Sequence, residues 1–395
     1  MLQRRKRDRL DRLTDGPLRV AIVSESFLPS VNGVTNSVLR VIEHLREHGH
    51  EVLVIAPGPG EEWYGDVPVV RVRAFDVPRY EDLRVGMPLA RLTSVLRDFR
   101  PDVVHLAAPA VLGAAGLRAA RRLGVPTVAV FQTDLAGFAR RHGLGRVSDG
   151  IWNYLRWVHG QADRTLAPST STVWALRTRG VPNVHHWARG VDLERFDPRH
   201  RSADLHRFLA PNAEVLVGYI GRLAREKQVE RLAPLADLDG VRLVVVGDGP
   251  ERAELERELP TTRFVGFQNG ADLSRLHATL DVFVHTGIDE TFCQALQESM
   301  ASGVAAVAPS AGGPIDLVRH GQTGYFWSPE APETLVGAVA ELAGDAELRA
   351  RFGAAARADV EHRPWGSIMD ELLGHYRTTA TAALGEDLDA DSFVA

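Results

Sequence analysis

Leu18-Arg-Val-Ala-Ile-Val-Ser24 and Val215-Leu-Val-Gly-Tyr-Ile220 are two short apolar stretches, each led by β-branched residues and followed by a loop. Such stretches are typical of buried strands. The first is followed by apolar residues at helical spacing and then by a second strand-like stretch, Glu51–Ala56. The second is followed in the same way by Val241–Val246. Strands that alternate with helices favour parallel sheets with right-handed crossovers.

Further strand-like stretches continue this pattern in both halves of the chain. They are Val103–Leu106, Thr127–Phe131, Arg164–Ala167, Phe264–Val265, Val282–His285 and Val304–Ala308. The apolar pattern lapses between residues 190 and 210, around Asp197-Pro198. The sequence therefore predicts an α/β fold with two doubly wound domains, joined in that stretch.

Composition restricts the class of protein. The chain has 395 residues, 45% hydrophobic and 25% charged, which is ordinary for a globular protein. A single cysteine, Cys293, excludes an intramolecular disulfide and fits a reducing compartment. No apolar stretch is long enough for a spanning helix, and the basic N-terminus lacks the apolar segment of a signal peptide. We therefore expect a cytoplasmic protein.

Charge is distributed unevenly between the two halves. Residues 1–200 carry a net charge of +8 and residues 201–395 a net charge of -13. The basic half contains several arginines within residues 4–12 and an amphipathic stretch from Pro88 to Arg100. Basic amphipathic surfaces bind anionic lipid, so peripheral membrane contact is one prediction. The alternatives are an apolar stripe that packs on the first sheet and chance clustering of solvated charge.

The sequence lacks several common nucleotide-binding motifs. There is no G-x-G-x-x-G after a strand and no P-loop motif, which disfavours dinucleotide dehydrogenases and P-loop enzymes. His44, His48 and His50 lie where a surface helix ends, a position that favours cationic side chains, and we interpret them in this way rather than as a metal site. We predict no metal, no cofactor and no nucleic-acid partner.

Gly221-Arg-Leu-Ala-Arg-Glu-Lys227 follows a predicted strand directly. Ligands of open α/β sheets bind at the carboxyl ends of strands, so Arg222 and Lys227 are well placed for an anion. The chain has only two lysines, Lys6 and Lys227, against forty-four arginines. A compact ammonium at this position therefore points to a specific role, although a solvated loop is the simpler alternative.

A second informative segment runs from Asp289 to Gly303, after the predicted strand Val282–His285. If the segment is helical from its start, Glu290 and Glu298 lie about 12 Å apart along the axis. Carboxylates accept paired hydroxyl hydrogen bonds, and helix-terminal amides bind phosphate. The segment therefore predicts one elongated ligand held at both ends. The simpler interpretation pairs Glu290 with the helix dipole.

These residues resemble the donor-site signature of the family four glycosyltransferases. The resemblance rests on the Glu290–Glu298 pair and on several surrounding motifs. These motifs are Val31-Asn-Gly-Val34, Gly190-Val-Asp192, Gly221–Lys227, Val246-Gly-Asp-Gly-Pro250, Met300-Ala-Ser-Gly303, Ala311-Gly-Gly-Pro314, and Trp365 with Tyr376. The resemblance implies the GT-B architecture, in which two Rossmann-like domains face a deep cleft, and retaining transfer from a nucleotide sugar.

The domain boundaries that follow from this resemblance cover the whole chain. We expect a basic disordered arm (1–17), an acceptor-binding domain (18–195), a nucleotide-sugar-binding domain (196–363), a closing helix that returns to the first domain (364–378) and a mostly disordered acidic tail (379–395).

Within the family, Phe131-Gln-Thr-Asp134 and Glu290-Thr-Phe-Cys-Gln294 resemble the GDP-mannose-dependent glycolipid α-mannosyltransferases. The resemblance implies metal-independent transfer of mannose to a glycolipid or another hydroxyl acceptor. Gln132 stands where many relatives have a histidine that contacts the transferring sugar.

The same resemblance assigns roles to individual residues. Arg222 and Lys227 would stabilise the leaving diphosphate, together with the amides of Thr291, Phe292 and Cys293. Gly33 would let the first-domain loop approach the phosphates, and Gly266-Phe267 would lie beside the base of the nucleotide. Glu298 would hold the ribose, Glu290 the hexose hydroxyls, and Gln132 the sugar from the first domain.

Three alternative functions remain open on the sequence. The loop Gly266-Phe267-Gln268 offers no carboxylate to guanine, so a UDP-sugar donor with a soluble acceptor is the first alternative. The second is a nucleotide-sugar 2-epimerase of the same fold. The third, a protein that only binds its ligand, is disfavoured by the joint presence of two cations and two glutamates.

Overall fold

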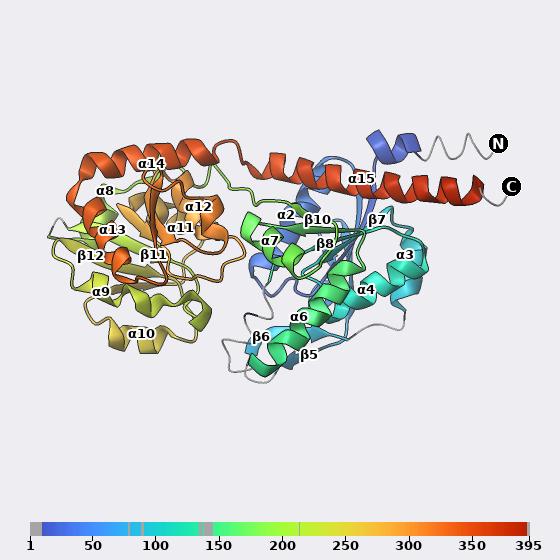
Figure 1. The fold of residues 1–395 in the computed structure, drawn as a ribbon, viewed down its shortest axis with the longest axis horizontal. Helices are drawn as coiled ribbons and strands as arrows, with labels where there is room; N and C mark the ends of the chain where they lie inside the picture. The colour runs from blue at the N-terminus through green and yellow to red at the C-terminus, as the bar shows by residue number, and fades with distance from the viewer. Residues whose placement is uncertain are drawn as a thin grey trace.

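The computed structural model describes residues 10–77, 80–87, 91–133, 137, 145–212 and 214–392. It contains two separate parallel sheets with helices on both faces, one in each half of the chain (Figure 1). The predicted α/β architecture of two doubly wound domains is confirmed.

The first sheet has eight strands in the order β10-β9-β8-β7-β1-β2-β4-β3, all parallel except for β3 against β4. Its strands are β1 (Arg19–Ser24), β2 (Glu51–Pro57), β3 (Trp63–Tyr64), β4 (Val67–Val72), β7 (Val103–Ala107), β8 (Thr127–Val130), β9 (Arg164–Ala167) and β10 (Val184–His186). A separate hairpin is formed by β5 (Ala74–Val77) and β6 (Tyr80–Gly86). The helices of this half are α2 (Gly33–Glu47), α3 (Leu92–Phe99), α4 (Val111–Arg122), α6 (Gly145–Gly160) and α7 (Thr170–Thr178).

The second sheet has six parallel strands in the order β13-β12-β11-β14-β15-β16. They are β11 (Val215–Ile220), β12 (Val241–Val246), β13 (Arg263–Gly266), β14 (Val282–Val284), β15 (Ala305–Pro309) and β16 (Gly324–Trp327). The helices are α8 (Ala203–Leu209), α9 (Ala233–Ala236), α10 (Arg252–Glu258), α11 (Gly270–Thr279), α12 (Gln294–Ala301), α13 (Glu333–Gly344) and α14 (Ala346–Val360). Strand order reverses between β11 and β14, so the loops after these two strands meet at a topological switch point, where open α/β sheets bind ligands.

The last helix, α15 (Trp365–Ser392), crosses from the second domain and packs along the first (Figure 1). Its residues Ile368, Leu372 and Tyr376 are buried in the core of the first domain. The Tyr376 hydroxyl lies 2.6 Å from His105 Nδ1. The expected end of this helix at residue 378 is wrong. The helix continues because Leu384, among other later residues, is still buried against the same core.

The expected disordered arm 1–17 is also wrong for the part that the structure describes, since residues 10–15 are helical. Leu13 is only 1% exposed and belongs to the core of the first domain. Arg12 forms a bidentate ion pair with Asp102, and Arg377 of α15 donates to the Leu13 carbonyl at 2.8 Å. Burial and pairing therefore hold this segment in place. The arginines at positions 4–9 lie outside the described residues.

The predicted amphipathic stretch corresponds to α3, and residues 88–90 lie outside the described part of the chain. Leu92 and Leu96 are buried in the first-domain core, and Val95 and Phe99 pack against it. The alternative interpretation is therefore confirmed: this apolar stripe packs internally and is not available to a membrane. In the described part of the chain, no helix combines the length and the apolarity needed to cross a bilayer.

Candidate functional site

The loop that follows β11 is held against its neighbours by specific contacts. The buried Tyr219 donates from its hydroxyl to the Arg222 carbonyl at 3.0 Å. Lys227 ends a short 3-10 helix, Arg225–Lys227, and its carbonyl accepts from Thr286 Oγ1 at 2.7 Å. Thr286 lies in the loop after β14, so these bonds join the two loops of the switch point.

Lys227 and Glu290 meet directly in this place. The Lys227 ammonium lies 2.5 Å from Glu290 Oε1, and His285 Nε2 lies 3.0 Å from the same oxygen. The His285 side chain is only 4% exposed, and its ring stacks on Tyr219 with centroids 6.1 Å apart. We call Lys227, His285 and Glu290 the charged cluster.

Electrostatics in the charged cluster favour ionised groups. Burial by itself would raise the pKa of Glu290, but Lys227 and His285 beside it hold that pKa well below its usual range. Burial opposes the charge on His285, yet Cys293 and Glu290 raise the pKa of this imidazole to about 9. The pKa of Lys227 is raised too, because Glu290 outweighs burial. At neutral pH one carboxylate thus faces two cations.

Glu298 lies in a different environment. It belongs to α12, and its side chain is 19% exposed. His277 Nε2 lies 3.6 Å from Glu298 Oε2, while His277 Nδ1 lies 2.8 Å from Ser299 Oγ. Burial raises the pKa of Glu298 to about 8, against the opposing effect of Arg195. Burial also lowers the pKa of His277 to about 3, so this imidazole is neutral.

The helix that carries Glu298 begins later than the sequence suggested. Because α12 starts at Gln294, Glu290 lies in the preceding loop, and the expected helical rise of about 12 Å between the two glutamates does not apply. Thr291 is partly exposed, and Phe292 and Cys293 are 6% and 5% exposed. Cys293 has a φ of 120°, a conformation that a non-glycine residue adopts only under constraint.

The turn Ala311-Gly-Gly-Pro314 packs against this loop. The Gly313 amide donates to the Glu290 carbonyl at 2.8 Å. A Cβ at Gly313 would lie 2.1 Å from the Phe292 carbonyl oxygen. Only glycine can therefore approach so closely, and the two glycines fix the shape of the loop that bears Glu290.

The first domain contributes Gln132, which directly follows β8 and Phe131. Thr291 Oγ1 donates to the Gln132 carbonyl at 3.1 Å, so the predicted first-domain residue meets the predicted donor loop. Arg189 donates to Gln132 Oε1 at 2.6 Å. Gln132 Nε2 is buried without a hydrogen-bond partner among the described residues. A second contact between the domains joins Asp316 to the Thr170 amide, at 2.6 Å.

The remaining predicted residues lie at element ends. Gly33 is exposed at the first turn of α2, and no atom lies within 4 Å of a Cβ added there. Arg222 is exposed in the loop after β11. Gly266 ends β13 with a φ of 81°, and the Phe267 side chain beyond it is 69% exposed. An exposed aromatic ring at a strand end offers a stacking surface for a planar base.

Sequence reasoning missed His285, His277 and Arg189. His285 had a usable signal, since it is the first residue after β14 at the switch point. Arg189 and His277 had none, because each acts through a residue distant in the sequence: Arg189 contacts Gln132, and His277 faces Glu298.

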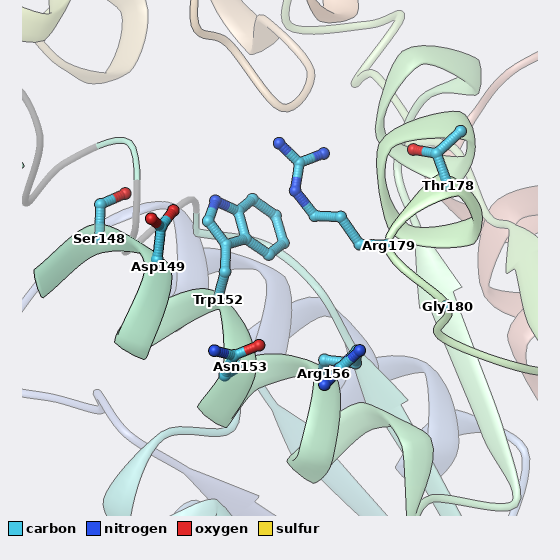
Figure 2. Close-up of a pocket in the computed structure, with 8 residues that line it drawn as sticks. All are labelled: Ser148, Asp149, Trp152, Asn153, Arg156, Thr178, Arg179 and Gly180. Carbon is cyan, nitrogen blue, oxygen red and sulfur yellow. The ribbon is translucent and has the colours of Figure 1, made fainter.

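A pocket lies between α6 and the end of α7 in the first domain (Figure 2). Trp152 and Arg179 line it from opposite sides, and the Arg179 guanidinium lies 4.2 Å from the centroid of the Trp152 ring. Asp149 and Arg156 line the same pocket. Phe131, next to Gln132, stacks on Trp152 with centroids 6.0 Å apart, so the pocket adjoins the residue that meets the donor loop.

Comparison with known sequences identifies relatives that cover about nine-tenths of the chain. Residues 31–195 match the family model described as Glycosyltransferase Family 4, and residues 202–359 match the model described as Glycosyl transferases group 1. A GDP-mannose-dependent alpha-mannosyltransferase of Mycolicibacterium smegmatis is 52% identical over 366 residues, covering 91% of this chain and 97% of that protein. A protein of the same name from Mycobacterium tuberculosis is 50% identical over 378 residues, covering 92% and 99%.

Solved structures share the fold at low identity. Sucrose-phosphate synthase from Thermosynechococcus elongatus superposes with a TM-score of 0.75 at 19% identity, covering 92% of this chain and all of that one. Anabaena HepE, solved in complex with UDP and glucose, superposes with a TM-score of 0.73 at 19% identity, covering 91% of this chain and all of that one. The two-domain architecture is thus a known one.

Proposed function

Since the chain belongs to the family four glycosyltransferases, we propose that it transfers an α-mannosyl residue from GDP-mannose to a hydroxyl acceptor with retention of configuration. Relatives that are 50–52% identical to this chain are named for GDP-mannose, which supports this donor. The observation that carries the proposal is the charged cluster. It places two cations and a carboxylate at the switch point between the two halves of the second sheet.

Chemistry at this site follows from charge. As the bond between the sugar C1 and the diphosphate oxygen breaks, negative charge grows on the diphosphate. Preorganised cations stabilise that charge most in the transition state. Arg222 and Lys227 take this role, beside the amides of Thr291, Phe292 and Cys293. No step requires a metal ion.

The hydroxyl of the acceptor attacks C1 on the face from which the diphosphate leaves, and its proton passes to the departing phosphate oxygen. Glu290 holds the mannose hydroxyls and Glu298 the ribose. Gly33 allows the first-domain loop to approach the phosphates, and the base stacks on Phe267. Gln132 offers its unpartnered Nε2 to the transferring sugar, as a hydrogen-bond donor that carries no charge.

We assign the acceptor to the first domain, with the pocket of Figure 2 holding its polar group. An aromatic ring flanked by arginine and carboxylate side chains suits a sugar or another polyhydroxylated group. In Trp152→Ala and Arg179→Ala, transfer to n-octyl glucoside or n-octyl mannoside is expected to fall about tenfold through a higher acceptor KM. The GDP-mannose Kd should stay unchanged. A matching loss of GDP-mannose affinity would reject this assignment.

Membrane contact belongs to the proposal for a lipid acceptor. The support is the net charge of +8 on residues 1–200, because the α3 stripe is buried and Arg12 is paired with Asp102. We expect the full chain to sediment with vesicles containing anionic phospholipid and to be released by salt. Equal sedimentation with neutral vesicles at low salt would contradict it.

A donor panel tests the function directly. Thermal midpoints and calorimetric Kd values are measured with GDP-mannose, UDP-glucose, UDP-N-acetylglucosamine and the free nucleotides, since a ligand of the native state raises its midpoint. We expect GDP-mannose to bind at least tenfold more tightly than either UDP-sugar. Preference for UDP-glucose would favour the first alternative function. Epimerised sugar without transfer would favour the epimerase, and binding without turnover would leave only a binding protein.

A further inference from the structure

Two histidines of α2 lie one turn apart near its C-terminal end, far from the charged cluster. His44 and His48 have the i, i+4 spacing with which helices present two imidazoles to one metal ion. Their ring centroids are 4.1 Å apart. His44 lies eleven residues beyond Gly33, about 16 Å along the helix axis. The pair is therefore separate from the proposed donor site.

A carboxylate from a distant part of the chain completes the group. Asp370 of α15 places Oδ1 3.1 Å from His44 Nε2. One ligand atom from each of His44, His48 and Asp370 lies within 4.8 Å of the others. Donor atoms of a tetrahedral zinc site are about 3.3 Å apart, given bonds of about 2.0–2.1 Å. Because His48 and the Asp370 carboxylate are exposed, small rotations suffice to bring them to that spacing.

Hydrogen bonding prepares one of the two imidazoles for a metal. His48 Nδ1 lies 2.8 Å from the His44 carbonyl oxygen, which can only accept, so Nδ1 carries the hydrogen and Nε2 keeps its lone pair. A backbone carbonyl that fixes the tautomer in this way is typical of metal-ligating histidines. His44 is 8% exposed, and its Nε2 is buried without a hydrogen-bond partner among the described residues. Asp370 Oδ1 lies 3.1 Å from this nitrogen, which therefore faces the group and ligates a metal once it carries no proton.

We propose that His44, His48 and Asp370 bind a divalent transition-metal ion of the zinc class, with water completing the coordination, and that this ion fastens α15 to α2. Two imidazoles and one carboxylate suit zinc rather than magnesium or calcium. The two helices pack side by side on one face of the first sheet (Figure 1). The ion is structural: it strengthens the docking of the helix that crosses from the second domain, and it takes no part in transfer.

The test uses the full chain, stripped with EDTA and dialysed, and measures ZnCl2 binding by calorimetry together with the thermal midpoint. We expect one zinc per chain and a raised midpoint, since zinc at 100 times its Kd favours the folded state about 100-fold. His48→Gln should weaken zinc binding at least 100-fold and Asp370→Asn at least tenfold. Both side chains are exposed, so both variants should fold.

Matched controls are His362→Gln and Glu371→Gln, which change an exposed histidine and the exposed neighbour of Asp370. Both should bind zinc as the original chain does. Zinc binding that survives in His48→Gln, or that falls equally in the controls, would overturn the proposal, as would an unchanged midpoint. Zinc binding and the thermal midpoint are measured without GDP-mannose, so the test does not depend on the proposed function, and turnover should stay unchanged in His48→Gln.

Discussion

Glu290 and Glu298 are eight residues apart in the chain, yet their surroundings have opposite effects. Glu290 lies 2.5 Å from an ammonium and 3.0 Å from an imidazole, which keep it ionised. Glu298 faces a neutral imidazole at 3.6 Å, and burial raises its pKa to about 8. The same side chain is therefore held as an anion in one place and favoured as a neutral acid in the other.

This difference matches the part of the donor that each glutamate contacts in the proposed function. A carboxylate between two cations preorganises the region where the diphosphate and the sugar separate, and its charge matters as the bond breaks. A protonated carboxyl can donate one hydrogen bond and accept another, which matches the vicinal hydroxyls of a ribose. In the proposed function, the pair therefore divides into a charged centre for catalysis and a neutral one for binding.

Glu290→Gln should have the largest effect. The amide keeps the shape but removes the charge between Lys227 and His285. We expect kcat to fall about 10³-fold, the loss typical of removing a preorganised electrostatic group. Breaking a buried ion pair should also lower the free energy of unfolding by about 3 kcal/mol. Single-turnover kinetics and urea denaturation measure the two effects. A variant with unchanged stability would mean that the cluster is not preorganised.

Lys227→Ala should have the next largest effect, a fall in kcat of about 10²-fold. Arg222→Ala should also lower kcat. Because we propose that both cations act on charge that develops in the transition state, the donor KM should change by only a few-fold. Steady-state kinetics with GDP-mannose separate the two parameters. If KM rose while kcat stayed constant, the cations would serve ground-state binding. Excess EDTA should leave turnover intact, since the proposed transfer requires no metal.

The strands were predictable because period and apolar content determine them locally. All ten predicted strands are present, with ends shifted by one or two residues. Six strands were missed: β3, β4, β5, β6, β10 and β16. Four of them, β3, β5, β10 and β16, have only two to four residues and give no periodic signal. The longer strands β4 and β6 were missed as well. The extent of α15 was missed for a different reason. Its acidic end resembles a solvated tail, and only the burial of Leu384 in the distant first-domain core makes it helical.

Individual residues of the site were predictable from the sequence, but the contacts between them were not. Lys227 and Glu290 were each singled out, but that they contact each other depends on the order of β11 and β14. His44 and His48 were interpreted only as cations at a helix end, because the carboxylate beside them comes from α15, more than three hundred residues later. Tertiary proximity of this kind leaves no trace in one sequence.

His285 allows a pH test of the charged side of the comparison. Its pKa is raised from about 6.5 to about 9, so its contribution to stability is complete below pH 6.5 and is lost as pH rises through 9. Turnover should fall about tenfold over the same rise, as the imidazolium beside Glu290 loses its proton. His285→Gln should start about tenfold lower and show no such step, apart from losses at higher pH from other groups. A step that persists in this variant would assign it elsewhere.

Glu298→Gln should have the smallest effect on catalysis and an effect on stability opposite to that of Glu290→Gln. The amide can still donate and accept one hydrogen bond, so we expect the donor KM to rise about fivefold with kcat nearly unchanged. Between pH 4.5 and 8 the folded protein holds a proton on Glu298 that the unfolded chain releases, so this group lowers stability as pH rises through that window.

Glutamine does not titrate, so the variant should match the original chain near pH 4.5 and exceed it by about 1–2 kcal/mol at pH 8, the cost of a poorly paired buried polar group. Urea denaturation at the two pH values measures this difference. His277→Gln is the matched control, since it alters the neighbour that faces Glu298 and leaves the titrating carboxyl in place. If Glu298→Gln proved less stable than the original chain at pH 8, Glu298 would be a paired carboxylate like Glu290, and the contrast between the two would be lost.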